Sequence, residues 1–430
     1  MHVFFSGIGG VGIGPAALIA KQAGYEVSGS DAREGQVVEE LRQKGISIHV
    51  GQNQEQLAKV HSQKPIDWFV YTAALPPDHS ELVFCRDNGI ITMKQYEFIN
   101  QILTQHNLEL VAIAGTHGKT TTTAMVIWLF EKLKIPTSYS LGGRVANSDM
   151  GHFNPRSHFI VVEADEFNRK FLVLKPRLSI ISGLGYDHHE VYPTRDDYNQ
   201  AFRDFLNQSQ SAILWRQDLE ILNKSSFSTQ VRAEDEQNPQ IDQIKLAGLY
   251  NRRDGWLAIK AVQQLTDTPL ERLVEVINAF PGVSRRFEPI APNLYSDDAH
   301  TPEKIIGCMS VAKELAAHSG QEIIVLYEPL TNRRMHYTAK DHSGVFEGAS
   351  RLYWLPSYLA REDPEQPILT PEELIKNLSP QLQKIARPAK KNQELQEIIA
   401  THLQKGDMVV AMAGGGADSL DTWLRQKFSS

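Results

Sequence analysis

The chain has 430 residues, and at about 150 residues per domain this length predicts two to four domains with sizeable cores. Hydrophobic residues make up 41% and charged residues 22%, as in ordinary globular proteins, and no stretch of about 20 apolar residues could cross a bilayer. The 44 basic and 51 acidic side chains give a net charge of -7, which argues against nucleic acid or a membrane as partner. Cys85 and Cys308 support neither a disulfide framework nor a cysteine zinc site, and no export signal begins the chain, so a cytoplasmic protein is expected. The sequence leaves the oligomeric state open.

The first hundred residues alternate short apolar runs with helical patterns, a rhythm typical of a mainly parallel sheet. Strands are expected at residues 3–5, 25–29, 46–48 and 67–72, and helices at residues 15–23 and 37–44. The polar stretch at residues 104–107 then predicts a domain boundary.

Two further α/β units follow. Strands are expected at residues 108–114, 159–162, 178–182, 323–327, 352–355 and 408–413. The acid-rich segment 233–239 is expected to be an exposed loop, and the Pro-Gly break at residues 280–282 predicts a second boundary. The predicted fold is therefore α/β in three domains, at residues 1–105, 106–282 and 283–430, the outer two Rossmann-like and the central one of P-loop type.

A glycine loop follows the first expected strand and opens the first helix. It consists of Gly7, Ile8, Gly9, Gly10, Val11 and Gly12, and Asp31 ends the second strand 19 residues later. This is the dinucleotide-binding fingerprint, in which backbone N–H groups approach a pyrophosphate and the acid accepts from a ribose. The loop could hold NAD or another nucleotide diphosphate, or could be only a tight strand-to-helix turn.

A second glycine loop runs from the strand at 108–114 into a long helix. It consists of Gly115, Thr116, His117, Gly118, Lys119, Thr120 and Thr121. Ile113 stands where a strict Walker A pattern has glycine, so the match is incomplete. Gly-Lys-Thr at a helix N-terminus still offers N–H donors and an ammonium group to phosphates and a hydroxyl group to Mg²⁺, which predicts a triphosphate site.

Acids and histidines follow the next two expected strands. Residues 163–166 carry three acids at the end of the strand 159–162, and His188 follows the strand 178–182. Such an acid cluster is costly at a buried strand end unless a cation neutralises it. The cluster therefore predicts a metal site, with a solvated group of acids as the alternative.

These residues resemble the Mur ligases, the ATP-dependent amide-forming enzymes of peptidoglycan precursor synthesis. The family pattern Gly-Thr-x-Gly-Lys-Thr is matched at residues 115–120, and similar motifs run through nearly the whole chain. The loop 7–12 with residues 29–31 is similar to the branch that joins L-alanine to UDP-N-acetylmuramate. The resemblance implies that the first domain binds the UDP-sugar, the central domain ATP and the third domain the amino acid.

The resemblance also implies roles for single residues. Lys119, Glu163, His188 and Arg286 would be catalytic, and Thr120, Glu163 and His188 would hold Mg²⁺. The UDP-sugar would contact residues 7–12 and Asp31. ATP would contact residues 115–121, Asn251, Arg286 and Asp298, and His300, Arg333 and Arg334 would contact the amino acid.

Three stretches depart from the family pattern. Asn251 is matched, but Asp254 stands where the adenine-side pattern has a second asparagine. The element at residues 297–302 is one residue short and has Thr301 in place of a histidine. Residues 327–334 are more similar to the ligase that recycles murein tripeptide.

The predicted activity is amide formation through an acyl phosphate, with L-alanine, UDP-N-acetylmuramate and ATP as substrates and Mg²⁺ as cofactor. A ligase that adds murein tripeptide is the alternative within the family. An NAD-dependent oxidoreductase would explain the first glycine loop but not the second. A non-catalytic nucleotide-binding relative is the third alternative.

Overall fold

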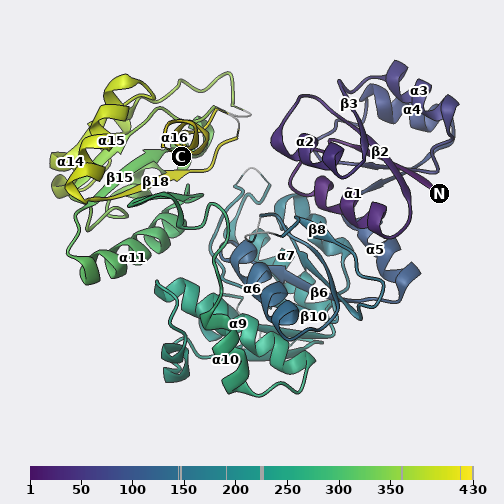
Figure 1. Cartoon of the computed structure of the whole chain (residues 1–430), viewed down its shortest axis with the longest axis horizontal. Coiled ribbons are helices and arrows are strands. Elements are labelled where there is room, and N and C mark those ends of the chain that lie inside the picture. The colour runs from purple at the N-terminus through teal and green to yellow at the C-terminus, as the bar shows by residue number, and fades with distance from the viewer. Residues whose placement is uncertain are drawn as a thin grey trace. The chain divides into compact units, whose positions relative to one another are not determined.

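The structure of the chain, a computed structural model, describes residues 1–143, 145, 148–189, 191–222, 227–359, 362–416 and 418–428 (Figure 1). The strands within these residues form three sheets. The chain divides into two compact units, one of Met1–Ile244 with Arg253–Pro281, the other of Lys245–Arg252 with Gly282–Ser430. None of the described helices is long and apolar enough to span a bilayer.

The first sheet is parallel and has the order β3-β2-β1-β4-β5. Its strands are β1 (His2–Ser6), β2 (Glu26–Asp31), β3 (Ser47–Val50), β4 (Trp68–Tyr71) and β5 (Ile91–Lys94). Alternate side chains of a strand point to opposite faces, so Val3 and Phe5 pack into one core cluster and Phe4 into another. Because helices cover both faces, β1 is buried along its whole length.

The second sheet has the order β12-β11-β10-β6-β9-β7-β8, and only the β7–β8 pair is antiparallel. Its strands are β6 (Glu109–Ala114), β7 (Thr137–Ser140), β8 (Gly151–His152), β9 (Phe159–Glu163), β10 (Leu178–Ile181), β11 (Ser211–Trp215) and β12 (Gln230–Glu234). Strand β6 lies between β9 and β10 and runs parallel to both, so the carboxyl ends of all three strands meet at one edge. This edge carries the candidate site.

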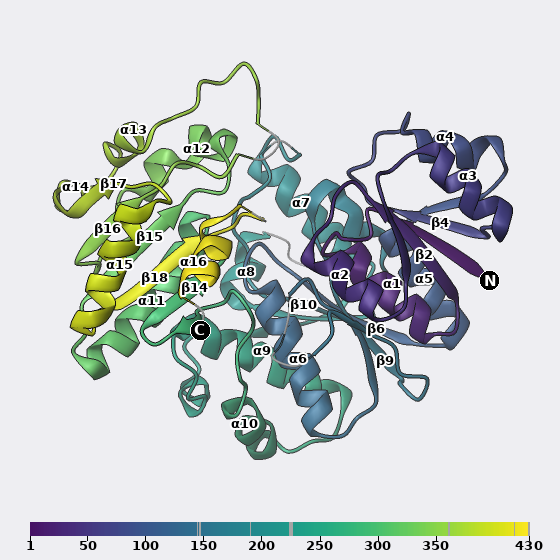
Figure 2. The same cartoon turned by 45° about the horizontal axis from the view of Figure 1, so that its top comes forward.

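The third sheet belongs to the second unit and has the order β13-β14-β18-β15-β16-β17. Its strands are β13 (Glu288–Ala291), β14 (Leu294–Asp297), β15 (Ile323–Glu328), β16 (Arg351–Trp354), β17 (Ala386–Pro388) and β18 (Met408–Ala413). All pairs are parallel except β13–β14. Figure 2 shows β15, β16 and β18 side by side, and a core cluster packs on each face of the sheet.

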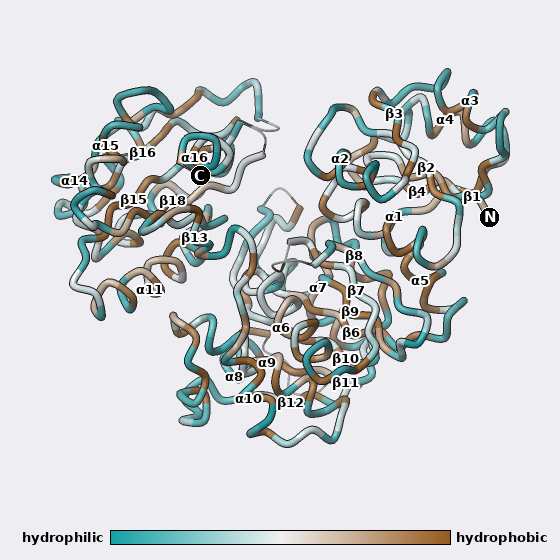
Figure 3. Tube along the Cα trace, viewed as in Figure 1, coloured by the Kyte–Doolittle hydropathy of each residue, from teal (hydrophilic) through white to brown (hydrophobic). Residues whose placement is uncertain are grey.

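Helices fill the connections between strands. They are α1 (Ile13–Gln22), α2 (Gln36–Gln43), α3 (Gln54–Gln63), α4 (Ser80–Asp87), α5 (Gln95–His106), α6 (Lys119–Lys132), α7 (Arg195–Asn207), α8 (Arg216–Ile221), α9 (Leu249–Leu265), α10 (Leu270–Asn278), α11 (Pro302–Ser319), α12 (Asn332–Thr338), α13 (Pro371–Ile375), α14 (Pro380–Ile385), α15 (Gln393–Lys405) and α16 (Leu420–Phe428), with short 3₁₀ turns at Phe167–Val173, Pro239–Gln243 and Ala339–His342. Hydrophobic segments concentrate along the central strands (Figure 3).

The α/β fold is confirmed, and each expected strand overlaps an observed one. The expectation of an exposed loop at residues 233–239 is wrong at its start, because Ala233 and Glu234 end strand β12. Glu234 is buried and accepts a hydrogen bond from the indole Nε1 of Trp256 at 2.9 Å, an acceptor role that its charge alone does not indicate. The division into compact units falls between Pro281 and Gly282 but does not separate residues 1–105, so the two boundaries between the three expected domains stay predictions.

Candidate functional site

The second glycine loop connects β6 to α6 in a conformation that needs glycine at two positions. Gly115 has a φ of 142° and Gly118 a φ of 77°, both in the region that side chains disfavour. A Cβ atom on Gly118 would also lie 2.6 Å from Oδ1 of Asp254. The acid that departs from the family pattern therefore lies against this loop.

The segment that follows β10 supports the loop from one side. The Thr116 N–H donates to the carbonyl of Gly183 at 2.8 Å, and its hydroxyl oxygen accepts from the N–H of Gly185 at 2.8 Å. The same hydroxyl lies 2.7 Å from the Tyr198 hydroxyl. The ring of His117 packs so closely on Gly183 that a Cβ there would lie 2.0 Å from its Cε1. Two predicted loop residues thus fix the backbone through contacts within the protein.

Lys119 forms a partly buried ion pair with Glu166. Its ammonium group lies 2.9 and 3.2 Å from the two carboxylate oxygens and also donates to the carbonyl of Gly115. The Glu166 side chain is only 1% exposed. Burial lowers the pKa of Lys119, but attraction from Glu166 and Asp165 outweighs it, so the pKa lies above its ordinary value. The ammonium group is therefore charged at neutral pH.

Thr120 and Glu163 meet at the same edge of the sheet. The Thr120 hydroxyl donates to Oε1 of Glu163 at 2.9 Å, and the N–H of Gly142 donates to Oε2 at 3.0 Å. Tyr96 of α5 fixes the strand end, since its hydroxyl donates to the carbonyl of Glu163 and accepts from the N–H of Asp165, each at 2.9 Å. The structure thus brings two of the predicted metal ligands together, and their metal-binding role stays a prediction.

The third predicted metal ligand lies beside a different acid. His188 Nε2 is 3.6 Å from Oε1 of Glu166. Asp165, Glu166 and His188 each offer a ligand atom, and the three atoms lie within 4.8 Å of one another. Burial raises the pKa of Asp165, but the nearby charges of Lys170 and Lys119 outweigh this effect, so the pKa lies below its ordinary value. This carboxylate is therefore ionised at neutral pH. Carboxylate and hydroxyl oxygens are the ligands that Mg²⁺ prefers, so the residues at this edge fit such an ion.

The first glycine loop uses its backbone N–H groups differently. Gly7 and Ile8 donate to the carbonyl of Ser30 at 2.8 and 3.0 Å, and Gly10 donates to Gly7 at 3.0 Å. The Gly9 N–H donates to Oδ2 of Asp31 at 2.8 Å. The acid that the fingerprint places on a ribose therefore holds the loop itself.

The remainder of this loop is open on one side. Val11 is 64% exposed, and Gly10 beside it is exposed as well. A Cβ on Gly12 would lie 2.5 Å from Oε1 of Gln95, so a side chain there would displace the Gln95 amide where the loop enters α1.

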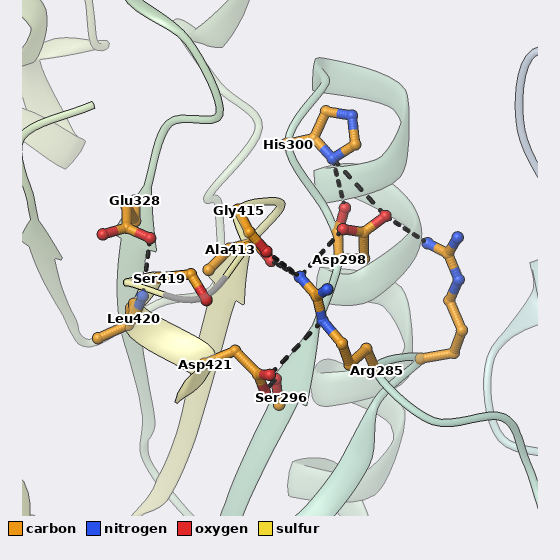
Figure 4. A network of polar contacts seen from close by, with 12 residues as sticks. Arg285, Ser296, Asp298, His300, Glu328, Ala413, Gly415, Ser419, Leu420 and Asp421 are labelled. Atoms are coloured by element: carbon orange, nitrogen blue, oxygen red, sulfur yellow. Dashed lines mark hydrogen bonds and ion pairs between the residues drawn. The ribbon is translucent and has the colours of Figure 1, made fainter. Parts of the chain in front are cut away.

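Three of the predicted residues of the second unit form a cluster centred on Asp298 (Figure 4). Arg286 Nη1 lies 3.5 Å from Oδ2 of Asp298, and Arg285 Nη2 lies 3.3 Å from Oδ1. His300 Nδ1 lies 2.6 Å from the backbone carbonyl of the same residue. Burial raises the pKa of Asp298, but His300 and the two arginines outweigh it, so the pKa lies below its ordinary value. The structure therefore joins three of the predicted residues in one charged cluster.

The remaining predicted residues of this unit lie on two helices. Asn251 in the first turn of α9 donates through its amide to the carbonyl of Ala247 at 2.7 Å. Arg333 and Arg334 lie in the first turn of α12, where the N–H of Arg333 donates to Oε2 of Glu362 at 2.8 Å. Glu362 of the chain itself thus occupies the N-terminus of α12, where the carboxylate of a substrate could otherwise bind. The predicted ligand contacts of Asn251, Arg333 and Arg334 stay predictions.

The model of the Mur ligase family, catalytic domain, matches residues 2–107, and the model of the Mur ligase middle domain matches residues 113–263. The chain belongs to the Mur ligase family. It is 28% identical over 397 residues to the UDP-N-acetylmuramate–L-alanine ligase of Porphyromonas gingivalis, which covers 84% of this chain and 86% of that protein.

Two solved structures share the fold of this Mur ligase. The UDP-N-acetylmuramate–alanine ligase of Thermotoga maritima matches with a TM-score of 0.72 at 22% identity, over 96% of this chain and 95% of that one. A murein peptide ligase from Psychrobacter arcticus matches with a TM-score of 0.65 at 21% identity, over 96% of each chain. Both matches support the α/β architecture described above.

Sequence reasoning missed two residues of this Mur ligase that the structure places beside the predicted ones. Glu166 was part of the acid cluster, but nothing in the order of residues told which acid would face Lys119. Arg285 donates to the carbonyls of Ala413 at 2.7 Å and Gly415 at 3.2 Å as well as facing Asp298. Its only sequence signal is the adjacent arginine pair.

Proposed function

We propose that this Mur ligase joins L-alanine to the lactyl carboxylate of UDP-N-acetylmuramate, with ATP as the energy source. The observation that carries the proposal is the loop 115–120, where Lys119 and Thr120 begin a helix and carboxylates from the neighbouring strand end face both. A helix N-terminus with an ammonium and a hydroxyl group is suited to a triphosphate. The name of the relative from Porphyromonas gingivalis supports the choice of substrates.

The proposed chemistry has two steps. A lactyl carboxylate oxygen attacks the γ-phosphorus of ATP, the bond to the bridging oxygen breaks, and ADP leaves. The amine of L-alanine then attacks the acyl carbon, loses a proton, and displaces inorganic phosphate. Lys119 would stabilise negative charge on the transferring phosphoryl group, and Glu163 would orient the amine.

Mg²⁺ is part of this proposal as a cofactor. Thr120, Glu163 and His188 would hold it, with Asp165 and Glu166 as further acids in reach. When bound, the ion would neutralise phosphate charge and so reduce the repulsion between the two anionic substrates. The carboxylates at this edge lie close together and repel one another, and a divalent cation between them would reduce this repulsion.

A ligase for murein tripeptide is the second candidate, suggested by residues 327–334 alone, and the curated relatives do not favour it. The test incubates the pure protein with ATP, Mg²⁺ and UDP-N-acetylmuramate and compares phosphate release with L-alanine, glycine, L-serine and murein tripeptide. Release that depends on L-alanine supports the proposal. A preference for tripeptide would replace it, and no release with any donor would remove both.

The oxidoreductase alternative loses its main support in the first glycine loop. Asp31 accepts from Gly9, so its carboxylate already has a role within the loop. The second loop and its acids also have no part in hydride transfer. Tight NADH binding without any ATP turnover would be needed to revive this alternative.

A further inference from the structure

Glu166 is a buried carboxylate at the proposed ATP site to which the proposed reaction assigns no step of its own. Its side chain is 1% exposed, and its two oxygens face the ammonium group of Lys119 at 2.9 and 3.2 Å. The Tyr198 hydroxyl donates to Oε1 at 3.3 Å, and His188 Nε2 lies 3.6 Å from the same oxygen. The carboxylate is therefore oriented from several sides.

The ion pair competes with a phosphate for the same donor. Lys119 gives its hydrogen bonds to Glu166 and to the carbonyl of Gly115, and a phosphate entering the loop must take over part of them. Glu166 cannot withdraw into water, because other side chains enclose it. Its charge then lies close to the phosphate charge in a medium that screens poorly, which makes the two anions repel each other.

A cation that arrives with the phosphates would remove this repulsion. Asp165, Glu166 and His188 offer ligand atoms within 4.8 Å of one another, so Glu166 could turn from Lys119 towards a divalent ion. The Glu166 carboxylate thus both pairs with Lys119 and lies within a group of possible metal ligands.

We propose that Glu166 is a positioning residue that holds Lys119 in the empty loop and weakens the binding of any triphosphate that comes without a divalent cation. This inference rests on the proposed triphosphate site but not on the identity of the amino acid or the sugar. A purely structural ion pair would behave differently, because removing its charge would leave phosphate binding unchanged or weaken it.

The test uses the full chain and measures binding of inorganic tripolyphosphate by calorimetry in EDTA. Glu166→Gln keeps the shape and one acceptor for Lys119 but removes the charge. We expect this variant to bind metal-free tripolyphosphate at least tenfold more tightly than the parent protein. Glu166→Asp keeps the charge and should bind as weakly as the parent protein, while its kcat falls because Lys119 is less well placed.

Glu234→Gln is the matched control. Glu234 is also buried in the first unit, where it accepts from Trp256, and it has no role in the proposed site. Its substitution should leave tripolyphosphate binding unchanged in EDTA. A similar gain in this control would show that net charge alone raised the affinity, and would overturn the inference.

Three further results would overturn it. Glu166→Gln could bind metal-free tripolyphosphate no better than the parent protein, or the parent protein could bind equally well with and without Mg²⁺. If Glu166→Gln does not fold, Glu166→Ala takes its place, and failure of both to fold would show a structural role instead. Absence of L-alanine-dependent phosphate release would overturn the proposed function but leave this binding comparison intact.

Discussion

The two glycine loops of the first unit connect a strand to a helix in the same way, but the acids beside them have different partners. Both leave a parallel strand and open a helix, at Gly7–Gly12 and at Gly115–Gly118. In the first loop the acid, Asp31, accepts a backbone N–H of the loop. In the second loop the acids face the side chains of Lys119 and Thr120. The first arrangement fixes a shape, whereas the second concentrates opposite charges that a phosphate and a cation can rearrange.

The largest expected effect comes from removing the ammonium group of the second loop. Lys119→Ala should lower phosphate release by about 10³-fold, because a preorganised cation that stabilises the transferring group contributes roughly 3–4 kcal/mol. Steady-state phosphate release measures this loss, with a thermal melt to confirm folding. A folded variant that retains a tenth of the activity would contradict the assignment of Lys119.

Adding a methyl group to the second loop tests how strongly its backbone and its surroundings require glycine. Gly118→Ala forces a side chain into a φ of 77° and places Cβ 2.6 Å from Asp254, so we expect it to lose about 2 kcal/mol of stability and most activity. Gly24→Ala is the control, because Gly24 has a φ of 92° but no atom within 4 Å of the added Cβ. The control substitution should cost only about 1 kcal/mol of stability, measured by chemical denaturation. Equal losses in the two variants would show that the positive φ alone, and not the contact with Asp254, causes the loss of stability.

A substitution in the first loop should affect the binding of a different substrate from a substitution in the second loop. Asp31→Ala removes a charge-assisted hydrogen bond to Gly9 that stabilises the loop by about 1.5 kcal/mol. If this loss is transferred in full to ligand binding, it corresponds to roughly tenfold in affinity. The KM for the UDP-sugar should rise about tenfold while the KM for ATP stays unchanged. An equal rise in both values would mean that the two loops do not act separately.

The smallest effect concerns the support of the second loop and depends on pH. Burial raises the pKa of Asp218 to about 7, and its Oδ1 accepts from the N–H of Leu184, next to the segment that holds Thr116. The folded state binds this proton more tightly than the unfolded chain, whose aspartate pKa is about 3.9. The stability from this group is therefore complete below about pH 4 and is lost as the pH rises to about 7.

Asp218→Asn removes this titration. The parent protein should lose about 1 kcal/mol more stability than the variant between pH 6 and pH 7, as measured by urea denaturation at both values. An identical pH dependence of the two proteins would show that Asp218 does not titrate in this range.

Local patterns predicted most of the scaffold. Runs such as residues 108–114 and 408–413 are apolar enough to show buried parallel strands, and they coincide with β6 and β18. The edge strand β5 was missed, because three of its four residues are exposed and it lacks an apolar run. Strand β12 was missed because its end falls within the acid-rich segment 233–239, which suggested a solvated loop.

The sequence by itself determined the α/β order, the two glycine loops and the family to which the chain belongs, since all of these depend on neighbours along the chain. Only the tertiary structure decided the partners of the acids: Glu166 with Lys119, Asp31 with Gly9, and Glu234 with Trp256. The physical reason is that parallel strands bring distant segments together at their carboxyl ends. Packing and strand register decide which of several acids there is buried against a cation. Neither can be derived from the spacing of the residues along the chain.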